Sequence, residues 1–447
     1  MAIFYPYASD ISRPAPREAQ VVDGRVLGER VLIATAMLLL YVLFGLLYDQ
    51  VVAPIYAFGG FVANPAAQAW PQAALVFASG LLMPRTMAKM SDVFVWLSMI
   101  VLLVPAAVLV SHEGVESGTM LMMFGGVALV KALCVLFERL HLLESWVKSR
   151  RDDYRVAIGP LLVLLFAVLA LLAVHVGGAL SFNFQDVYDL RFDFNASLTF
   201  PLNYLLPFAA GPLAGCITAM ALEKRQYPVL GVVMVCGFLF FGLSSHKALM
   251  FNPPFVFCAW LFLRQRRGGL LLTAFFAVLA IGTLLVHGSL ADLLGASFAN
   301  RLVFIPAQIH YYFFREFQDI GFQYWAESRF GLGLSQSRLP IDSVNYIGLV
   351  MAGDASIGAN TGWIANGYMN AGFAGIAFYA VVLALTLHAL DTLGRRYSAS
   401  LVAAAFLVPV LNIINAIDLL AGFLTGGLLL LFVVFLMAVR PAGGTAA

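Results

Sequence analysis

The stretch VAIGPLLVLLFAVLALLAVHVG, residues 156–177, decides the fold, because His175 is its only ionisable side chain. A helix needs about 20 apolar residues to cross the hydrocarbon core of a bilayer. The whole chain of 447 residues has the same character, with 62% hydrophobic residues, 11% charged residues and a mean hydropathy of +0.90. A soluble globular chain is about 25% charged. The sequence therefore predicts an all-α, polytopic integral membrane protein and excludes a peripheral enzyme with a single anchor.

Hydropathy divides the chain into about twelve membrane-spanning segments. The whole chain, 1–447, is then one polytopic membrane domain with two longer external segments, 178–199 and 290–367. The predicted spans cover residues 31–48, 70–84, 93–111, 118–137, 156–177, 200–222, 227–243, 248–263, 268–289, 368–391, 399–416 and 420–438.

Basic residues are distributed unevenly between the two sides of this predicted topology. Most of the 26 Lys and Arg residues fall in the termini and in the loops of one side. Cytoplasmic loops are enriched in Lys and Arg, so we expect both termini in the cytoplasm. The residues on that side include Arg25, Arg30, Arg85, Lys89, Arg139, Lys224, Arg225, Arg264, Arg266, Arg267, Arg395 and Arg396.

The basic residues on the external side are the most informative for function, because the same rule selects against them there. They are Arg191, Lys247, Arg301, Arg315, Arg329 and Arg338. A guanidinium group matches the geometry of phosphate oxygens, so several such residues converging from separate loops would form a diphosphate site. Two simpler interpretations stay open: ion pairs on a solvated surface, and contacts with lipid headgroups.

The external segment 290–367 is too long and too apolar for a floppy connector. Apolar residues from Leu302 to Phe313 recur at helical spacing, which predicts an amphipathic helix that packs on the bundle. The segment resembles a lid over a site at the outer membrane face. An α-helix would place Arg301 and Arg315 on one face. The residues between them on that face are Ile305, Gln308 and Tyr312.

Motifs for metal or nucleotide chemistry are absent from the sequence, which has no HExxH, Asp-rich loop, Walker motif or GxSxG elbow. A mechanism without a metal or a cofactor is favoured. The net charge of +2 does not favour nucleic acid as a partner. Polar residues within the spans are functional candidates by default, yet no series of carboxylates crosses the bundle as in a proton-coupled transporter. These polar residues are Lys131, Asn412, Asn415 and Asp418.

Four ordered runs resemble the Wzy-type polymerases of O-antigen and other lipid-linked oligosaccharides. They are Asp186-Val-Tyr188-Asp189-Leu-Arg191, Gly242-Leu-Ser244-Ser245-His246-Lys247, Asn300-Arg301-Leu-Val-Phe304-Ile-Pro306-Ala, and Ala359-Asn360-Thr-Gly362 with Tyr368, Asn370, Gly372 and Gly375 after it. The resemblance covers about residues 180–380. The first 150 residues match only in being hydrophobic. The Arg-x10-Gly signature of some members fails here, since Tyr312 and Pro340 stand eleven residues after Arg301 and Arg329.

The resemblance implies a GT-C-like membrane glycosyltransferase in the bacterial inner membrane, with its active site at the periplasmic face. Such an enzyme transfers a growing glycan from one undecaprenyl diphosphate carrier onto the non-reducing end of a new lipid-linked repeat unit. Its implied partners are undecaprenyl-diphosphate-linked oligosaccharides, membrane lipids and a chain-length-determining co-polymerase of the Wzz type.

The candidate site residues follow from the external cations and from the resemblance. Arg191, Lys247 and Arg301 are expected around the diphosphate, with Arg329 as an addition. Tyr188, Tyr311 and Asn360 are expected to hydrogen-bond sugar or phosphate. The candidates for a base that accepts the proton of the acceptor hydroxyl are Asp189, Glu316, Asp354 and His310. A lone histidine such as His310 is more often structural.

Two rival functions stay open. An O-antigen ligase would use similar external arginines to transfer the finished polymer to the lipid A core. A flippase or transporter of lipid-linked sugars would place its charges in a central cavity between internal repeats. The absence of an evident repeat and the long external segment 290–367 argue against the transporter.

Overall fold

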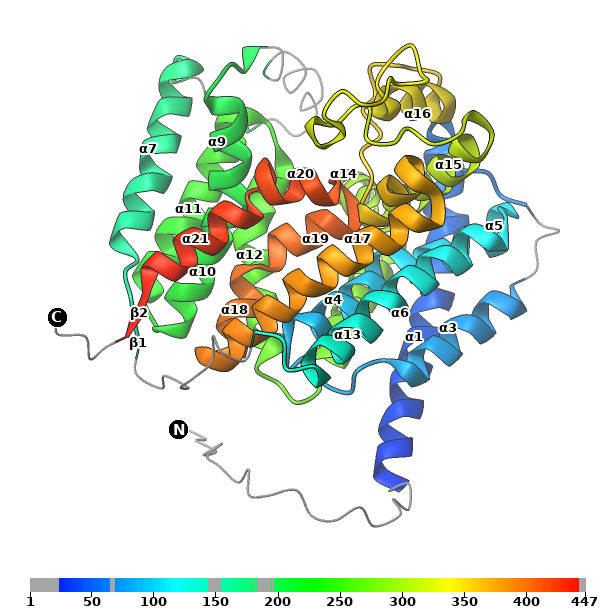
Figure 1. Cartoon of the computed structure of the whole chain (residues 1–447), viewed down its shortest axis with the longest axis horizontal. Helices are drawn as coiled ribbons and strands as arrows, with labels where there is room; N and C mark the ends of the chain where they lie inside the picture. The colour runs from blue at the N-terminus through cyan, green and yellow to red at the C-terminus, as the bar shows by residue number, and fades with distance from the viewer. Residues whose placement is uncertain are drawn as a thin grey trace.

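The computed structural model describes residues 24–64, 69–143, 154–178, 180–182, 194 and 197–441, and these form a predominantly helical multi-pass membrane protein (Figure 1). Its α-helices are α1 Gly24–Leu47, α2 Ala53–Ile55, α3 Trp70–Leu82, α4 Met90–Ser98, α5 Val104–Glu113, α6 Ser117–Arg139, α7 Gly159–His175, α9 Leu202–Phe208, α10 Ala214–Glu223, α11 Tyr227–Ser244, α12 Lys247–Leu263, α13 Gly268–Leu285, α14 Ser289–Leu294, α15 Ile305–Ile320, α16 Ser343–Ala352, α17 Trp363–Arg396, α18 Ala399–Ala405, α19 Leu407–Asn415, α20 Leu419–Leu424 and α21 Leu428–Ala438.

Several of these helices are joined end to end by π-helical turns. The π-helical segments are η1 Tyr48–Val52, η3 Met99–Leu103, η5 Ala209–Leu213 and η6 Gly295–Phe304. Two short 3-10 helices, η2 Ala57–Gly59 and η7 Arg329–Gly331, lie in loops. The π-helix is rare and is found mostly as single turns at functional sites, so the ten residues of η6 are unusual.

Nine helices in the described ranges are long and apolar enough to cross a membrane. They are Gly24–Ile55, Met90–Glu113, Ser117–Arg139, Leu202–Glu223, Tyr227–Ser244, Gly268–Leu285, Leu290–Ile320, Trp363–Arg396 and Leu419–Ala438. Eight of them coincide with predicted spans. The ninth, Leu290–Ile320, lies in the predicted external segment 290–367, where the sequence predicts an amphipathic helix and no span, and its mean hydropathy of 1.2 is the lowest of the nine.

The other predicted spans are also helical, but shorter than the nine. Helices α3, α7 and α12 have 13, 17 and 17 residues. The predicted span 399–416 is divided into α18 and α19, which have 7 and 9 residues. The structure therefore supports a polytopic helical bundle with fewer long helices than the sequence predicts.

A small two-stranded sheet departs from the all-α prediction. Strand β1, Tyr154–Val156, pairs antiparallel with β2, Val439–Pro441, with Arg155 opposite Arg440. The sheet joins the chain just before α7 to the end of α21. Three-residue strands are too short to show a period of two in the sequence, so the sequence could not reveal them.

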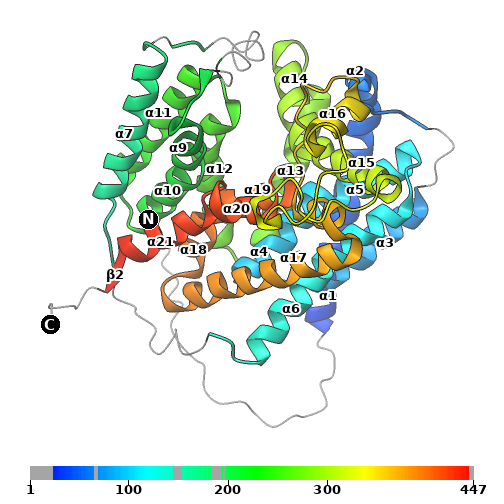
Figure 2. The same cartoon turned by 45° about the horizontal axis from the view of Figure 1, so that its top comes forward.

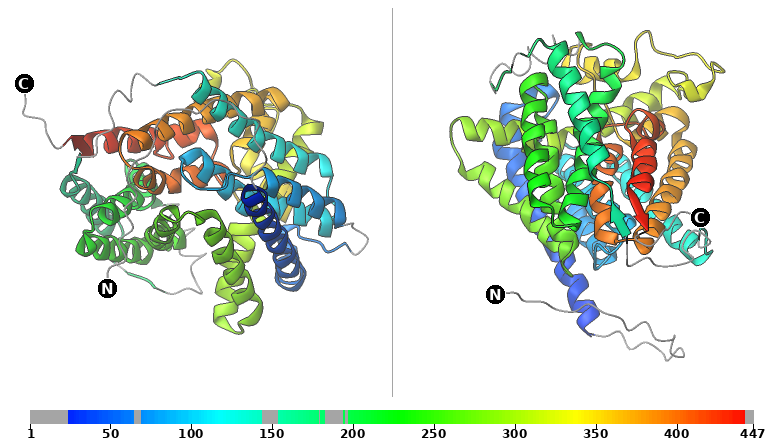
Figure 3. Two further views of the ribbon diagram at one scale, coloured as in Figure 1. Left: turned by 90° about the horizontal axis from the view of Figure 1, so that it is seen from below. Right: turned by 90° about the vertical axis from the view of Figure 1, so that its left-hand side faces the viewer.

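Helix packing brings segments together that are far apart in the sequence. The helix Met90–Glu113 is almost wholly buried, and α17 packs along α6 (Figures 1 and 2). Helix α1 packs between α3 and α13, and its first turns project beyond the bundle (Figure 3). Helices α7, α9, α10, α11 and α12 form a second group beside them (Figure 2).

Several of the basic residues assigned to one side of the membrane gather at one end of the bundle. Glu29 pairs with Arg85 and, at 2.9 Å, with Arg266. The Nζ atom of Lys89 lies 2.6 Å from both carboxylate oxygens of Glu138. We call this end, at the bottom of Figure 1, the basic end, and the opposite end, where the α11–α12 turn and α16 lie, the loop end. The predicted topology therefore places these loops together correctly.

Candidate functional site

The first external segment, 178–199, lies largely outside the described residues. Tyr188, Asp189 and Arg191 are among the undescribed positions, so their predicted roles stay predictions. Arg329 begins the 3-10 helix η7. The remaining predicted site residues belong to helices α12 and α15, segment η6 and the loop before α17.

Lys247 and Arg301 come from different elements and lie near each other at the loop end. Lys247 is the first residue of α12 and is half-buried, whereas Arg301 lies in η6 and is exposed. They are close enough for their positive charges to interact. An anion bound there would be attracted by both positive charges, and a guanidinium group matches the geometry of phosphate oxygens. Of the predicted diphosphate residues that the structure describes, this pair is the one it brings together.

Local structure at this pair suits an anion. Ser245 adopts a left-handed conformation (φ 56°) that ends α11, and α12 begins two residues later with Lys247. The N-terminus of a helix carries free N–H groups and a partial positive charge. The turn therefore adds backbone donors to the charge of Lys247.

Arg315 has a different environment, which agrees with the simpler ion-pair interpretation. Its Nη2 atom lies 2.7 Å from Oε1 of Glu316, and its guanidinium carbon lies 4.5 Å from the ring centre of Tyr312 and 5.7 Å from that of Tyr311. Tyr346 donates a hydrogen bond of 3.3 Å to Glu316. Arg315 and Tyr311 thus belong to a cluster of their own on α15.

The predicted shared face of Arg301 and Arg315 is not a continuous exposed stripe. Gln308 and Tyr312 are buried, and the side-chain amide of Gln308 donates to the carbonyl of Gly60 at 3.0 Å. A π-helical turn holds more residues than an α-helical turn. Because η6 is π-helical, it rotates the face of α15 relative to Arg301, and the sequence gives no sign of this change.

His310 is fully buried inside the protein. Its Nδ1 atom lies 2.7 Å from the carbonyl oxygen of Pro306 and 3.2 Å from Oγ1 of Thr361. Its Nε2 atom is buried and has no partner among the described residues. An enclosed ring cannot reach a substrate hydroxyl in this conformation, so the geometry favours the structural interpretation of His310.

Asn360 is exposed in the loop before α17. The first turns of α17 fold back on the rest of that helix. Ala371 and Gly372 interrupt the helix, and Gly372 has a φ of 59°. A Cβ on Gly367 would lie 3.0 Å from the carbonyl oxygen of Gly375. The segments 363–370 and 373–396 therefore form a hairpin whose two arms meet at glycines. The predicted span 368–391 missed this hairpin because hydropathy does not show where a helix turns back on itself.

A polar network runs from this hairpin through the interior. The Nδ2 atom of Asn366 donates to the carbonyl of Thr361 at 2.8 Å, and Oδ1 of Asn370 accepts from the backbone N–H of Trp325 at 2.7 Å. The indole of Trp325 donates to the hydroxyl of Tyr379 at 2.9 Å, and Tyr379 donates to Asp418 at 2.6 Å. Asp418, singled out in the sequence as a polar residue within the spans, thus ends a structural network.

Glu113 is a functional candidate that the sequence reasoning missed. It ends α5 at the loop end, and its Oε1 atom accepts a hydrogen bond of 2.6 Å from Tyr48. The side chain of Gln308 and the backbone of Val62 also hydrogen-bond to it. The sequence offers one feature that could have indicated Glu113: it is a carboxylate two residues beyond the end of the predicted span 93–111.

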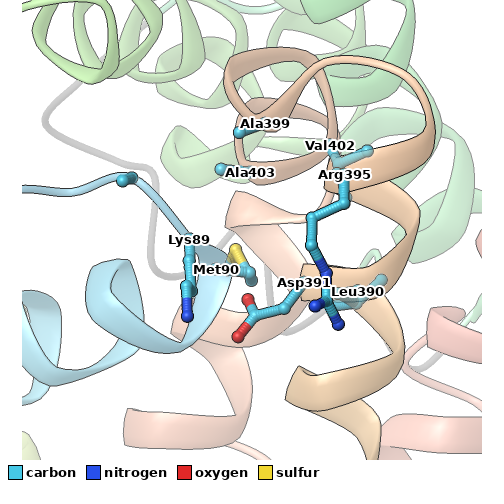
Figure 4. A pocket seen from close by; sticks show the side chains of 10 residues that line it. Lys89, Met90, Leu390, Asp391, Arg395, Ala399, Val402 and Ala403 are labelled. Atoms are coloured by element: carbon cyan, nitrogen blue, oxygen red, sulfur yellow. The ribbon is translucent and has the colours of Figure 1, made fainter. Parts of the chain in front are cut away.

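A small pocket lies at the basic end, between α4, α17 and α18 (Figure 4). Lys89, Asp391 and Arg395 converge on it, and its volume is about 80 Å³. Pockets for drug-sized ligands have volumes of about 300–1,000 Å³, so this pocket cannot hold a lipid-linked oligosaccharide. Among the described residues, no three His, Cys, Asp or Glu side chains could hold a metal ion.

Comparison with known proteins adds no identification. No protein-family model, no curated protein and no solved structure matches the chain.

Proposed function

We propose that this protein polymerises undecaprenyl-diphosphate-linked oligosaccharide repeat units of O-antigen or a related surface polysaccharide. The observation that carries the proposal is the proximity of Lys247 and Arg301, from α12 and η6, at the loop end. The proposal also rests on the ordered sequence runs around these residues, which resemble Wzy-type polymerases.

The chemistry requires little beyond binding and positioning. A lipid diphosphate is a good leaving group, so the protein must hold the diphosphate, neutralise the charge that develops on it, and place the acceptor hydroxyl at the donor sugar. Lys247 and Arg301 supply two positive charges for this purpose, and Arg191 is proposed as a third. Tyr188, Tyr311 and Asn360 are proposed to bind sugar or phosphate.

The location of the reaction is part of the proposal. Basic loops at the opposite end of the bundle indicate that the basic end faces the cytoplasm. The loop end and its cation pair would then face the periplasm of a bacterial inner membrane, with both termini inside. A GT-C-like architecture with about twelve crossings, and a Wzz-type co-polymerase as partner, are proposed on the resemblance alone.

The test uses purified protein in proteoliposomes with a synthetic undecaprenyl-diphosphate repeat unit and no added metal. A ladder of longer glycans is the expected product. Transfer that occurs only after addition of lipid A core would identify a ligase instead. Substrate that moves across the bilayer without a change in length would identify a flippase.

A further inference from the structure

Two of the four base candidates named from the sequence, Glu316 and His310, are engaged within the protein. Glu316 is paired with Arg315 at 2.7 Å. Asp354 accepts hydrogen bonds of 2.8 Å from both the backbone and the side chain of Ser356. His310 is enclosed, and Asp189 lies outside the described residues. The loop end offers one further carboxylate as a candidate base, Glu113.

Glu113 has the environment that a base needs. It is half-buried at the end of a helix, and no Lys, Arg or His nitrogen of the described residues forms an ion pair with it. Its partners are neutral donors: Tyr48 at 2.6 Å, Gln308 and the backbone of Val62. Neutral donors orient a carboxylate without the full positive charge that would make it a weak base.

Helix α15 contacts the Glu113 carboxylate through Gln308. Gln308, on α15, also donates to Gly60 at 3.0 Å, which fixes its amide beside Glu113. Helix α5, which Glu113 ends, packs against both η6 and α15. The helix that Glu113 ends is therefore a neighbour of η6, the segment that carries the cation Arg301.

We propose that Glu113 is the general base of the transfer reaction, an inference that rests on the proposed function. Its carboxylate takes the proton of the acceptor sugar hydroxyl, and the hydroxyl oxygen forms a bond to the anomeric carbon of the donor glycan. The bond between that carbon and the diphosphate oxygen breaks, and its electron pair leaves with the lipid diphosphate. Tyr48 and Gln308 are positioning residues.

The test measures turnover and substrate binding for Glu113→Gln, which keeps the shape of the side chain and removes its basicity. We expect turnover per folded molecule to fall about 10²–10⁴-fold, with affinity for the lipid-linked substrate within about threefold of wild type. Glu116→Gln is the matched control, because Glu116 is an exposed glutamate three residues away. It should retain full activity.

A second variant separates basicity from folding. Glu113→Asp keeps a carboxylate at the site, so it should be at least tenfold more active per folded molecule than Glu113→Gln. Wild-type turnover in Glu113→Gln, or equal loss in both variants, would overturn the assignment of Glu113 while leaving polymerisation intact. A wild-type protein that forms no ladder would instead overturn the proposed function.

Discussion

The backbones of Gly367 and Gly375 are in direct contact, so that a Cβ on Gly367 would lie 3.0 Å from the carbonyl oxygen of Gly375. This contact closes the hairpin of α17. It positions Asn366 and Asn370 for the polar network that ties the hairpin to Trp325. Hydropathy alone does not predict this hairpin.

Replacement of Gly375 by Ala should therefore destabilise the protein. The new methyl group would overlap the backbone of Gly367, and overpacking of this kind costs about 1–3 kcal/mol. Thermal unfolding in detergent measures the effect. Gly125→Ala is the control, because Gly125 lies inside α6 with open space at its Cβ; it should be neutral or slightly stabilising. Equal unfolding temperatures for both variants would contradict the tight contact.

Tyr379→Phe should destabilise the interior network. The hydroxyl donates to Asp418 at 2.6 Å and accepts from Trp325 at 2.9 Å, so its removal leaves polar groups without a partner. An unsatisfied buried group costs about 1–3 kcal/mol. Tyr227→Phe is the control, since Tyr227 is 65% exposed. A stability loss no larger than that of the control would show that the network does not stabilise the fold.

Replacement of Lys131 alone by Met should destabilise the protein more than replacement of both Lys131 and its ion-pair partner Asp92. Lys131 lies 2.5 Å from Asp92, and Asp391 is near enough to interact with both. Removal of the lysine leaves carboxylates in the interior without their counter-charge, which costs about 3–5 kcal/mol. The double variant Lys131→Met, Asp92→Leu should recover part of this stability, and a double-mutant cycle measures the recovery. If the stability losses of the two single variants simply add in the double variant, Lys131 and Asp92 are not coupled.

Arg301→Ala should weaken binding of the lipid diphosphate. One charge-assisted hydrogen bond contributes about 1.5–3 kcal/mol, which corresponds to a loss of affinity of about 10–150-fold. Arg301→Lys should restore binding only in part, because ammonium cannot bind two phosphate oxygens in a fork. Titration of the reconstituted protein with undecaprenyl diphosphate measures the affinity. Arg395→Ala, at the basic end, should bind normally; a similar loss there would indicate a nonspecific charge effect.

Cysteine labelling tests the orientation of the two ends. Leu334→Cys, at a position 87% exposed in the loop between η7 and α16, should react with an impermeant maleimide in spheroplasts. Gln265→Cys, in the exposed turn between α12 and α13, should react only after the membrane is opened. The opposite labelling pattern would place the cation pair on the cytoplasmic face.

Hydropathy predicted the positions of most helices, because a membrane imposes long apolar segments on the sequence. It missed features that depend on tertiary contacts. Segment η6 changes the helical phase after Arg301, and the α17 hairpin depends on Gly367 meeting Gly375. The external cations led to the Lys247–Arg301 pair because topology made their position unusual. Glu113 was missed because its importance follows from Tyr48 and Gln308, which are distant in the sequence.

The most direct test of the central claim compares purified wild-type protein with Arg301→Ala on an undecaprenyl-diphosphate repeat unit, in EDTA and without lipid A core. The account predicts a ladder of polymer from the wild type and little or none from the variant, at equal amounts of folded protein. Unchanged substrate with the wild type, or the same ladder from both proteins, would contradict it.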